Sequence, residues 1–296
     1  MTLVVGFPPG KDDWSSIELG ATLARSAATD LLVVTVVPAV WPTPVAGHTD
    51  REFEDWAEQQ GSAAVAEAND ILAEHCPDVS GVARWTSGRS VASALLEQAE
   101  EIDAAMIVVG SGSTGSYGRV HPGATGEWLL HSSHVPVAVA TRGYAASAHG
   151  RIRRVSCAFR GDEKSLQTVE RTAAICADVG ASLRLVTFAV RGRTVYTAGV
   201  GAQAEDMVLE RWVSQATAAQ QSTLAALTGS ATAPADLDGV VATGRSWGAA
   251  VDHLDWDRDE VLVVGSSTAG VIERIFLSSN ASKIVRHSPV PVIVVP

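Results

Sequence analysis

A glycine-rich stretch near the middle of the chain has the composition of a phosphate-binding loop. It runs from Gly110 to Gly126 and directly follows an apolar segment, Met106–Val109. Closely spaced glycines let backbone N–H groups approach an oxyanion, because no Cβ atom holds the ligand away. A helix that begins after the loop would add the positive end of its dipole. A plain glycine-rich turn at a strand end has the same composition, so both interpretations stand.

Two arginines occupy loops of this kind. Arg119 lies inside the glycine-rich stretch, and Arg274 lies in a related stretch closer to the carboxyl terminus. A guanidinium can hold a phosphate through two parallel hydrogen bonds, or it can form a salt bridge in solvent or between domains. The GxxxxGK(S/T) phosphate loop of ATPases does not occur, and no general base stands out beside the loop. We therefore expect a binding protein without efficient catalysis, with no catalytic residue and no metal site.

The chain contains an internal repeat. The segment from Met106 to Ser111 recurs as Val261 to Ser266, and the two glycines in them are 155 residues apart (265 − 110). The same spacing relates Arg119 to Arg274 and Pro136 to Pro291. Agreement of several landmarks at one spacing indicates two homologous domains. We predict domains at 1–142 and 151–296, joined by a small, polar, glycine-bounded linker at 143–150.

Each half alternates short apolar segments with helical patterns. In the first half we expect strands at 3–6, 31–37, 81–86, 106–110 and 135–140, with helices at 15–29, 50–75 and 91–101 and one before the last strand. In the second half we expect strands at 155–159, 183–190, 239–242, 261–265 and 290–295, with helices at 164–179, 204–227 and 247–254 and again one before the last strand. Strands that are apolar on both faces and alternate with helices indicate a parallel sheet covered on both sides.

The predicted fold class is therefore α/β, with two tandem doubly wound, Rossmann-like domains. Each would hold a five-stranded, mostly parallel sheet with helices on both faces. Ligands of such sheets bind beyond the carboxyl ends of the strands. The loops after Gly6, Val36 and Gly110 are consequently the places where a site is expected.

Composition narrows the class of protein. The net charge is −11, the apolar fraction is 46% and there are three cysteines without metal-site spacing. The pI near 5.1 disfavours nucleic acid as a partner, because phosphate neutralisation needs a basic surface. Unpaired cysteines, the absence of a long apolar run and the absence of a signal-peptide pattern favour a cytoplasmic protein that does not enter a membrane.

Both halves resemble the universal stress protein family. The resemblance rests on the Val-Val-Gly-Ser strand ends, the loop arginines, and the closing segments from Glu127 and from Ser279, which run through a helix into Val-Pro-Val. It implies binding of an adenine nucleotide, ATP or AMP, with or without Mg²⁺. Nucleotide-binding members carry Gly-x2-Gly-x9-Gly-(Ser/Thr) in this loop.

The family's loop pattern is carried over residue by residue. In the first half it falls on Gly110, Ser113, Gly123 and Ala124, with Thr125 one residue late and Gly115 as a compensating glycine. In the second half it falls on Gly265, Thr268, Ser278 and Ser279, followed by Asn280. Serine replaces the second glycine in the first half, whereas only the first glycine survives in the second. The first half is therefore the favoured nucleotide site.

Other positions implied by the resemblance lie at the ends of the first two strands. Gly6, Phe7 and Pro8 follow the first strand, and the family's aspartate there is replaced by Pro8 and by Arg160. We expect Arg160 to face solvent rather than a phosphate. The backbone position that contacts adenine matches Val36 and Phe188.

Three functional hypotheses follow. The first is a nucleotide-linked stress-response regulator, and the alternative is an interaction or structural protein with degenerate loops that binds no nucleotide. The third, a slow ATP hydrolase or phosphate-transfer enzyme, ranks last because no general base is recognisable beside the loop. Exposed apolar last strands need a partner, and the family commonly pairs them about a two-fold axis. The resemblance thus implies an intramolecular pseudo-dimer of the two halves and further homodimerisation of whole chains.

Overall fold

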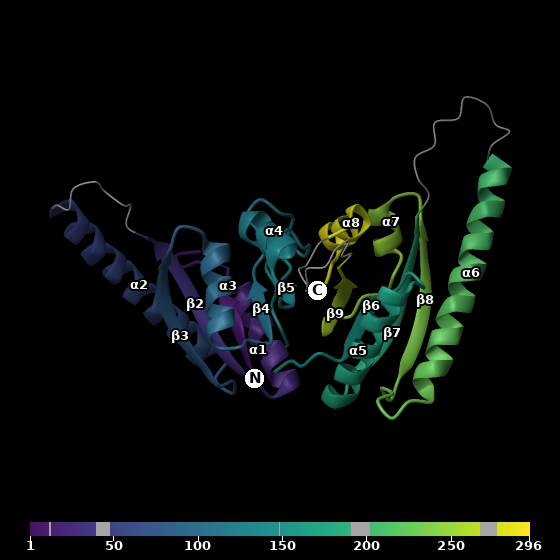
Figure 1. The fold of residues 1–296 in the computed structure, drawn as a ribbon, viewed down its shortest axis with the longest axis horizontal. Coiled ribbons are helices and arrows are strands. Elements are labelled where there is room, and N and C mark those ends of the chain that lie inside the picture. Colours follow the sequence, from purple (N-terminus) through teal and green to yellow (C-terminus); the bar gives the residue numbers. More distant parts are fainter. Residues whose placement is uncertain (12, 40–47, 148, 191–201, 267–276) are drawn as a thin grey trace.

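The computed structural model describes residues 1–11, 13–39, 48–147, 149–190, 202–266 and 277–296. Two α/β halves meet at an angle, and the long helices α2 and α6 lie at the two far ends of the molecule (Figure 1). Among the described residues, no helix is both long and apolar enough to cross a membrane.

The first half follows the predicted alternation of strands and helices. Its elements are β1 (Thr2–Gly6), α1 (Ser15–Ala27), β2 (Asp30–Pro38), α2 (His48–His75), β3 (Gly81–Gly88), α3 (Val91–Glu101), β4 (Met106–Val109), α4 (Gly123–Ser132) and β5 (Val137–Val139).

The second half repeats this order. Its elements are β6 (Arg154–Ala158), α5 (Glu163–Val179), β7 (Ser182–Val190), α6 (Ala202–Thr228), β8 (Leu237–Gly244), α7 (Trp247–Asp252), β9 (Glu260–Gly265), α8 (Ser279–His287) and β10 (Val292–Val295).

The strands form one ten-stranded sheet in the order β3-β2-β1-β4-β5-β10-β9-β6-β7-β8. Neighbouring strands within each half are parallel, which confirms the predicted doubly wound α/β class. The only antiparallel pair among the described strands joins the halves, with Ile293 of β10 opposite Ala138 of β5. β5 is shorter than the predicted strand 135–140, because Ser133 and Val135 form a turn closed by the Ser133 hydroxyl.

Local sequence explains where several helices begin. Ser90, Asp162, Ser246 and Ser278 each accept a hydrogen bond from a backbone N–H in the first turn of α3, α5, α7 and α8. Such caps satisfy amides that have no partner inside the helix. α4 differs, because it begins after Pro122, which offers no side-chain acceptor.

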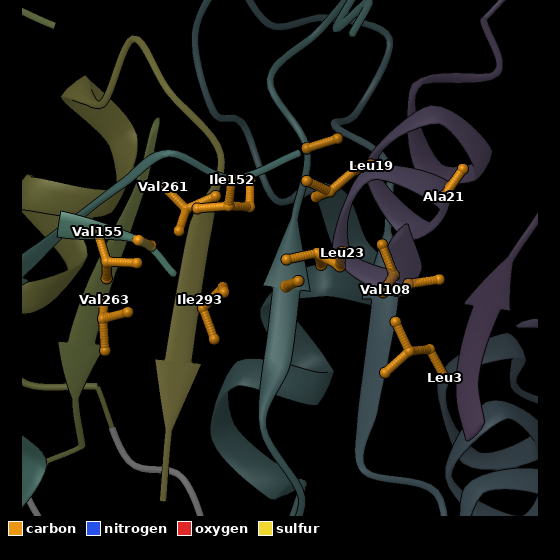
Figure 2. Close-up of a cluster of buried hydrophobic side chains, with 14 of the residues drawn as sticks. Leu3, Leu19, Ala21, Leu23, Val108, Ile152, Val155, Val261, Val263 and Ile293 are labelled. Carbon is orange, nitrogen blue, oxygen red and sulfur yellow. The ribbon is translucent and has the colours of Figure 1, made fainter. Parts of the chain in front are cut away.

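Two hydrophobic clusters contain residues of both halves. The first of them lies beneath α1 and α5. It contains Leu3, Leu23 and Val108 from the first half, and Val261 and Ile293 from the second. Figure 2 shows these side chains on both sides of the central strands. The two halves of the sheet therefore share a core on the face covered by α1 and α5.

The segment between the halves is packed against both of them. Tyr144 is 9% exposed, and the backbone N–H of Ile152 donates to Ser26 of α1 at 2.8 Å. Ser147 donates to Asp259 of the second half, and His149 lies 3.3 Å from Asp78 of the first. The domain boundaries at 142 and 151 stay a prediction, but the segment they enclose is a structural part of the interface.

Candidate functional site

A cavity of about 140 Å³ lies at the carboxyl ends of β6, β7 and β9 in the second half. This is the edge at which doubly wound sheets bind ligands. Its walls come from three strand ends, from the first turns of α5 and α8, and from α7. They include Phe159, Arg160, Asp162, Lys164, Ser165, Thr168, Val186, Thr187, Phe188, Trp247, Val264, Gly265, Ser266, Ser278, Asn280 and Ala281.

Two aromatic rings form one wall of the cavity. Phe188, near the end of β7, and Trp247, at the start of α7, have ring centroids 6.3 Å apart at an interplanar angle of 46°. The Lys283 ammonium lies 5.8 Å from the Trp247 ring centroid, within the range of a cation–π contact. The two tilted rings each offer an apolar face to a planar group, and Lys283 places a cation near the tryptophan.

A charged pair stands at the opposite end of the cavity. The guanidinium of Arg160 is ion-paired with Asp162, and its side chain is 63% exposed. Asp162 also accepts the Ser165 N–H at 2.9 Å as the cap of α5. Burial alone would raise the pKa of the Asp162 carboxyl, but the hydrogen bonds from Arg160 and Ser165 lower it. Arg160 is therefore exposed, as expected from the sequence, and it also lines the cavity.

The first turn of α8 supplies the remaining wall. Ser278 caps the helix by accepting the Ala281 N–H at 3.2 Å, and Ser279 and Asn280 follow in the first turn. Gly265 ends β9 beside α5, where an added Cβ would lie 2.7 Å from the Thr168 hydroxyl. A glycine is thus required for this close approach. Thr268 and Arg274 lie outside the described residues.

In the first half, the glycine-rich loop folds back on itself. The Gly112 N–H donates to the His121 carbonyl at 2.6 Å, and the His121 N–H donates to the Ser111 hydroxyl at 2.9 Å. A Cβ added at Gly115 would lie 2.4 Å from the Cβ of His121. The glycines here allow the loop to close on its own side chains. The first of the two interpretations, an open phosphate loop, therefore has less support than the structural turn.

The other loop positions of the first half are placed as follows. Gly110 ends the strand above Ser16 of α1, Ser113 is exposed, and Gly123 packs against Gly112. Ala124 and Thr125 lie in the first turn of α4. The cavity belongs to the second half, whereas the sequence favoured the first because it retains more motif glycines.

Arg119 is engaged with the other half of the molecule. Its guanidinium donates to the Asp252 carboxylate at 2.6 Å and to the backbone carbonyl of His287 at 2.5 Å. The adjacent Val120 N–H donates to the Ser288 carbonyl. Of the two roles considered for this arginine, the structure shows the interdomain salt bridge.

The strand-end positions of the first half also differ from a binding pocket. Gly6 and Phe7 are buried, and an added Cβ at Gly6 would lie 2.8 Å from Leu95. Pro8 is exposed. Val36 packs against the hydrophobic cluster to which α3 and α4 contribute. Val36 is half-buried there, and its match to the adenine-contacting position stays a prediction.

Sequence reasoning missed several side chains of the cavity. They are Asp162, Lys164, Ser165, Thr168 and Trp247. The aromatic wall could have been found by aligning the halves, since Phe188 matches Val36 and Trp247 matches Val91. The first half therefore has valines at the two positions where the second half has rings.

A GxSxG pentapeptide at Gly244–Gly248 was also overlooked. In nucleophile elbows such a serine sits on a strained turn with its hydroxyl exposed. Ser246 has an extended backbone, with φ −149° and ψ 166°, and its hydroxyl oxygen caps α7 by accepting the Ala249 N–H. The motif is a helix cap here.

Comparison with known proteins identifies the family. The universal stress protein family model matches residues 2–141 and 151–296. The chain belongs to the universal stress protein family. A universal stress protein of Mycobacterium tuberculosis H37Rv is 39% identical over 296 residues, covering all of both chains, and one of Mycobacterium bovis is equally similar.

Solved structures of this family show the same tandem fold. A universal stress protein from Archaeoglobus fulgidus superposes with a TM-score of 0.63 at 15% identity, covering 99% of this chain and 97% of that one. A putative universal stress protein from Pseudomonas aeruginosa gives 0.57 at 11% identity, with 99% and 92% covered. At these identities the likeness concerns the fold.

Proposed function

We propose that this tandem universal stress protein binds an adenine nucleotide, ATP or AMP, in its second half and acts as a stress-response regulator without efficient catalysis. The observation that carries the proposal is the cavity at the carboxyl ends of β6, β7 and β9, with an aromatic wall and a helix N-terminus. We further propose a cytoplasmic location, a pseudo-dimeric arrangement of the two halves, and homodimerisation of whole chains.

The size of the cavity suggests how a nucleotide would sit. About 140 Å³ is less than the roughly 300–1,000 Å³ typical of pockets that enclose a drug-sized ligand. The base would therefore occupy the cavity against Phe188 and Trp247. The phosphates would extend toward the first turn of α8, with Arg160 and Lys164 as nearby cations, and Mg²⁺ would accompany them if ATP is the ligand.

The absence of an obvious general base supports a regulator rather than a hydrolase. The described lining residues of the cavity include no histidine, and Asp162 is already engaged by Arg160 and Ser165. Among the described residues, no group of three or more His, Cys, Asp or Glu side chains could hold a metal ion.

The first test is native mass spectrometry of the purified chain with and without Mg-ATP and AMP, followed by calorimetric titration of variants. We expect one nucleotide per chain and a roughly 5- to 150-fold weaker Kd for Trp247→Ala, because stacking on an aromatic ring is worth roughly 1–3 kcal/mol. Trp128→Ala is the matched control, since Trp128 is an exposed tryptophan on α4 of the first half.

Two outcomes would contradict the proposal. A chain that stays empty at millimolar nucleotide would favour the alternative of an interaction protein with degenerate loops. Nucleotide binding that is unchanged by Trp247→Ala but weakened by Arg119→Ala would indicate that the nucleotide binds in the first half.

A further inference from the structure

A second groove, of about 340 Å³, runs beside α5 near the junction of the two sheets. It is lined by Pro136, Lys164, Gln167, Thr168, Arg171, Thr172, Ile175, Ser266, Val295 and Pro296. Ile175, in its wall, is 59% exposed.

The internal repeat shows what covers the equivalent surface in the first half. β1 and β6 pair with β2 and β7 in the same register at an offset of 152 residues, with Thr2 opposite Asp30 and Arg154 opposite Ser182. Helices α1 and α5 keep the same offset of 152 residues. The glycine that follows β4, Gly110, lies over Ser16 of α1, and the glycine that ends β9, Gly265, lies over Thr168 of α5. Arg171 and Ile175 of α5 are therefore the counterparts of Leu19 and Leu23 of α1.

These counterparts differ sharply in exposure. Leu19 is 0% exposed and Leu23 is 9% exposed, against 59% for Ile175. Leu19 and Leu23 belong to the same hydrophobic cluster as Tyr144 and Ile152 of the interdomain segment. Leu19, Leu23 and Ile152 can be followed in Figure 2.

The interdomain segment thus shows how a peptide lies on this helix face. It leaves β5, places Tyr144 near Thr22, and donates the Ile152 N–H to Ser26 one turn further along α1. The groove beside α5 occupies the equivalent place relative to β10, whose last residue Val295 lines it. It is also continuous with the β5–β10 junction, because Pro136 lies directly before β5.

The charge of the groove differs from that of the molecule. Its described lining residues include Lys164 and Arg171 but no Asp or Glu side chain, whereas the chain as a whole carries −11. The cations of Lys164 and Arg171 favour a partner segment that carries carboxylates.

We propose that this groove binds an extended acidic segment of a partner protein, with one bulky apolar side chain packed on Ile175 and carboxylates facing Arg171. The segment would lie on α5 as residues 142–147 and 149–152 lie on α1. The groove shares Lys164, Thr168 and Ser266 with the cavity described above. A ligand in either site would therefore contact a wall of the other.

The test uses the full chain without nucleotide, so that its failure is distinct from failure of nucleotide binding. The probe is a fluorescent peptide copying residues 141–152 with Arg142, His149 and Arg151 each changed to Glu. A second peptide also carries Tyr144→Ser and Ile152→Ser, which removes its apolar side chains. We expect saturable anisotropy with the first peptide and at least tenfold weaker binding of the second.

Variants of the protein locate the bound peptide. Ile175→Ala and Arg171→Glu should each weaken binding at least tenfold, and raising salt should weaken it for the wild type more than for Arg171→Glu. Leu166→Ala is the matched control on the same helix outside the groove. Circular dichroism checks that each variant keeps the fold.

Three results would overturn the proposal. The first is that acidic peptides with Tyr, Trp, Phe or Leu as the apolar residue do not bind at millimolar concentration. The second is that peptide binding is unchanged by both Ile175→Ala and Arg171→Glu. The third is that the chain forms a concentration-dependent dimer that Ile175→Ala abolishes. The last would assign the groove to a second copy of the chain.

Discussion

Individual side chains distinguish the two halves more than their backbones do. Phe188 and Trp247 wall a cavity in the second half, whereas Val36 and Val91 stand at the matching positions of the first. A ring presents a flat, polarisable face to a base, and a valine does not. A difference of two residues therefore gives the second half an aromatic wall that the first half lacks.

Charged side chains also hold the interdomain segment in place. Arg25 of α1 makes two hydrogen bonds to Asp78, at 2.8 and 3.0 Å, and His149 lies against the same carboxylate. The hydrogen bond from Arg25 is the main cause that lowers the pKa of Asp78 to about 2, from an ordinary value near 4. This carboxylate joins α1, the α2–β3 turn and the interdomain segment.

We predict that Asp78→Asn lowers the free energy of unfolding at pH 7 by about 1 kcal/mol, after allowance for the partial exposure of the carboxylate. The folded-state pKa of Asp78 is depressed, so its contribution is present above pH 4 and is lost as the pH falls toward 2. Denaturant titrations at pH 7 and pH 2.5 should therefore show a difference between wild type and variant that shrinks at the lower pH. A difference that is equal at both values would contradict this role.

At the scale of elements, the loop between β4 and α4 acts as a connector between the halves. It closes on itself through Gly112 and His121, and it presents Arg119 to Asp252 and His287 of the second half. The same stretch of glycines that suggests a phosphate loop therefore serves a tight turn that docks on a neighbour.

We predict that Arg119→Ala lowers the free energy of unfolding by about 1–2 kcal/mol and leaves the nucleotide Kd of the second half unchanged. The variant loses one partly exposed ion pair and one charge-assisted hydrogen bond to a carbonyl. Thermal melting and calorimetric titration measure the two effects separately. As a control for stability, Arg160→Ala removes an exposed pair within one half and should change unfolding by less than about 0.5 kcal/mol.

At the scale of the whole molecule, the halves share one sheet and two hydrophobic clusters. The central β5–β10 pair places Ile293 beside Ala138, and side chains from both halves surround it (Figure 2). A shared core makes the unfolding of one half costly for the other.

We predict a single unfolding transition for the wild type in differential scanning calorimetry. Ile293→Ala should lower stability by about 2–4 kcal/mol and split the transition into two, because it opens a cavity at the junction. Val186→Ala, in a small cluster at the far side of the second half, should lower stability without splitting. Two transitions in the wild type would show that the halves unfold independently.

The sequence by itself determined the fold class, the order of elements and the repeat. Short apolar segments such as Met106–Val109 and Val261–Val264, alternating with helical patterns, indicate central parallel strands, and helix caps such as Ser90 and Ser278 mark helix starts locally. These features depend on neighbours within a few residues, so they can be read along the chain.

Only the tertiary structure decided which half has a cavity, what Arg119 contacts and where the α5 groove lies. Each of these depends on contacts between residues far apart in sequence, such as Phe188 with Trp247 and Arg119 with Asp252. Counting motif glycines favoured the first half, because a glycine allows an open loop and a closed turn equally well. The choice between them is made by the side chains that fill the space, and those come from other elements.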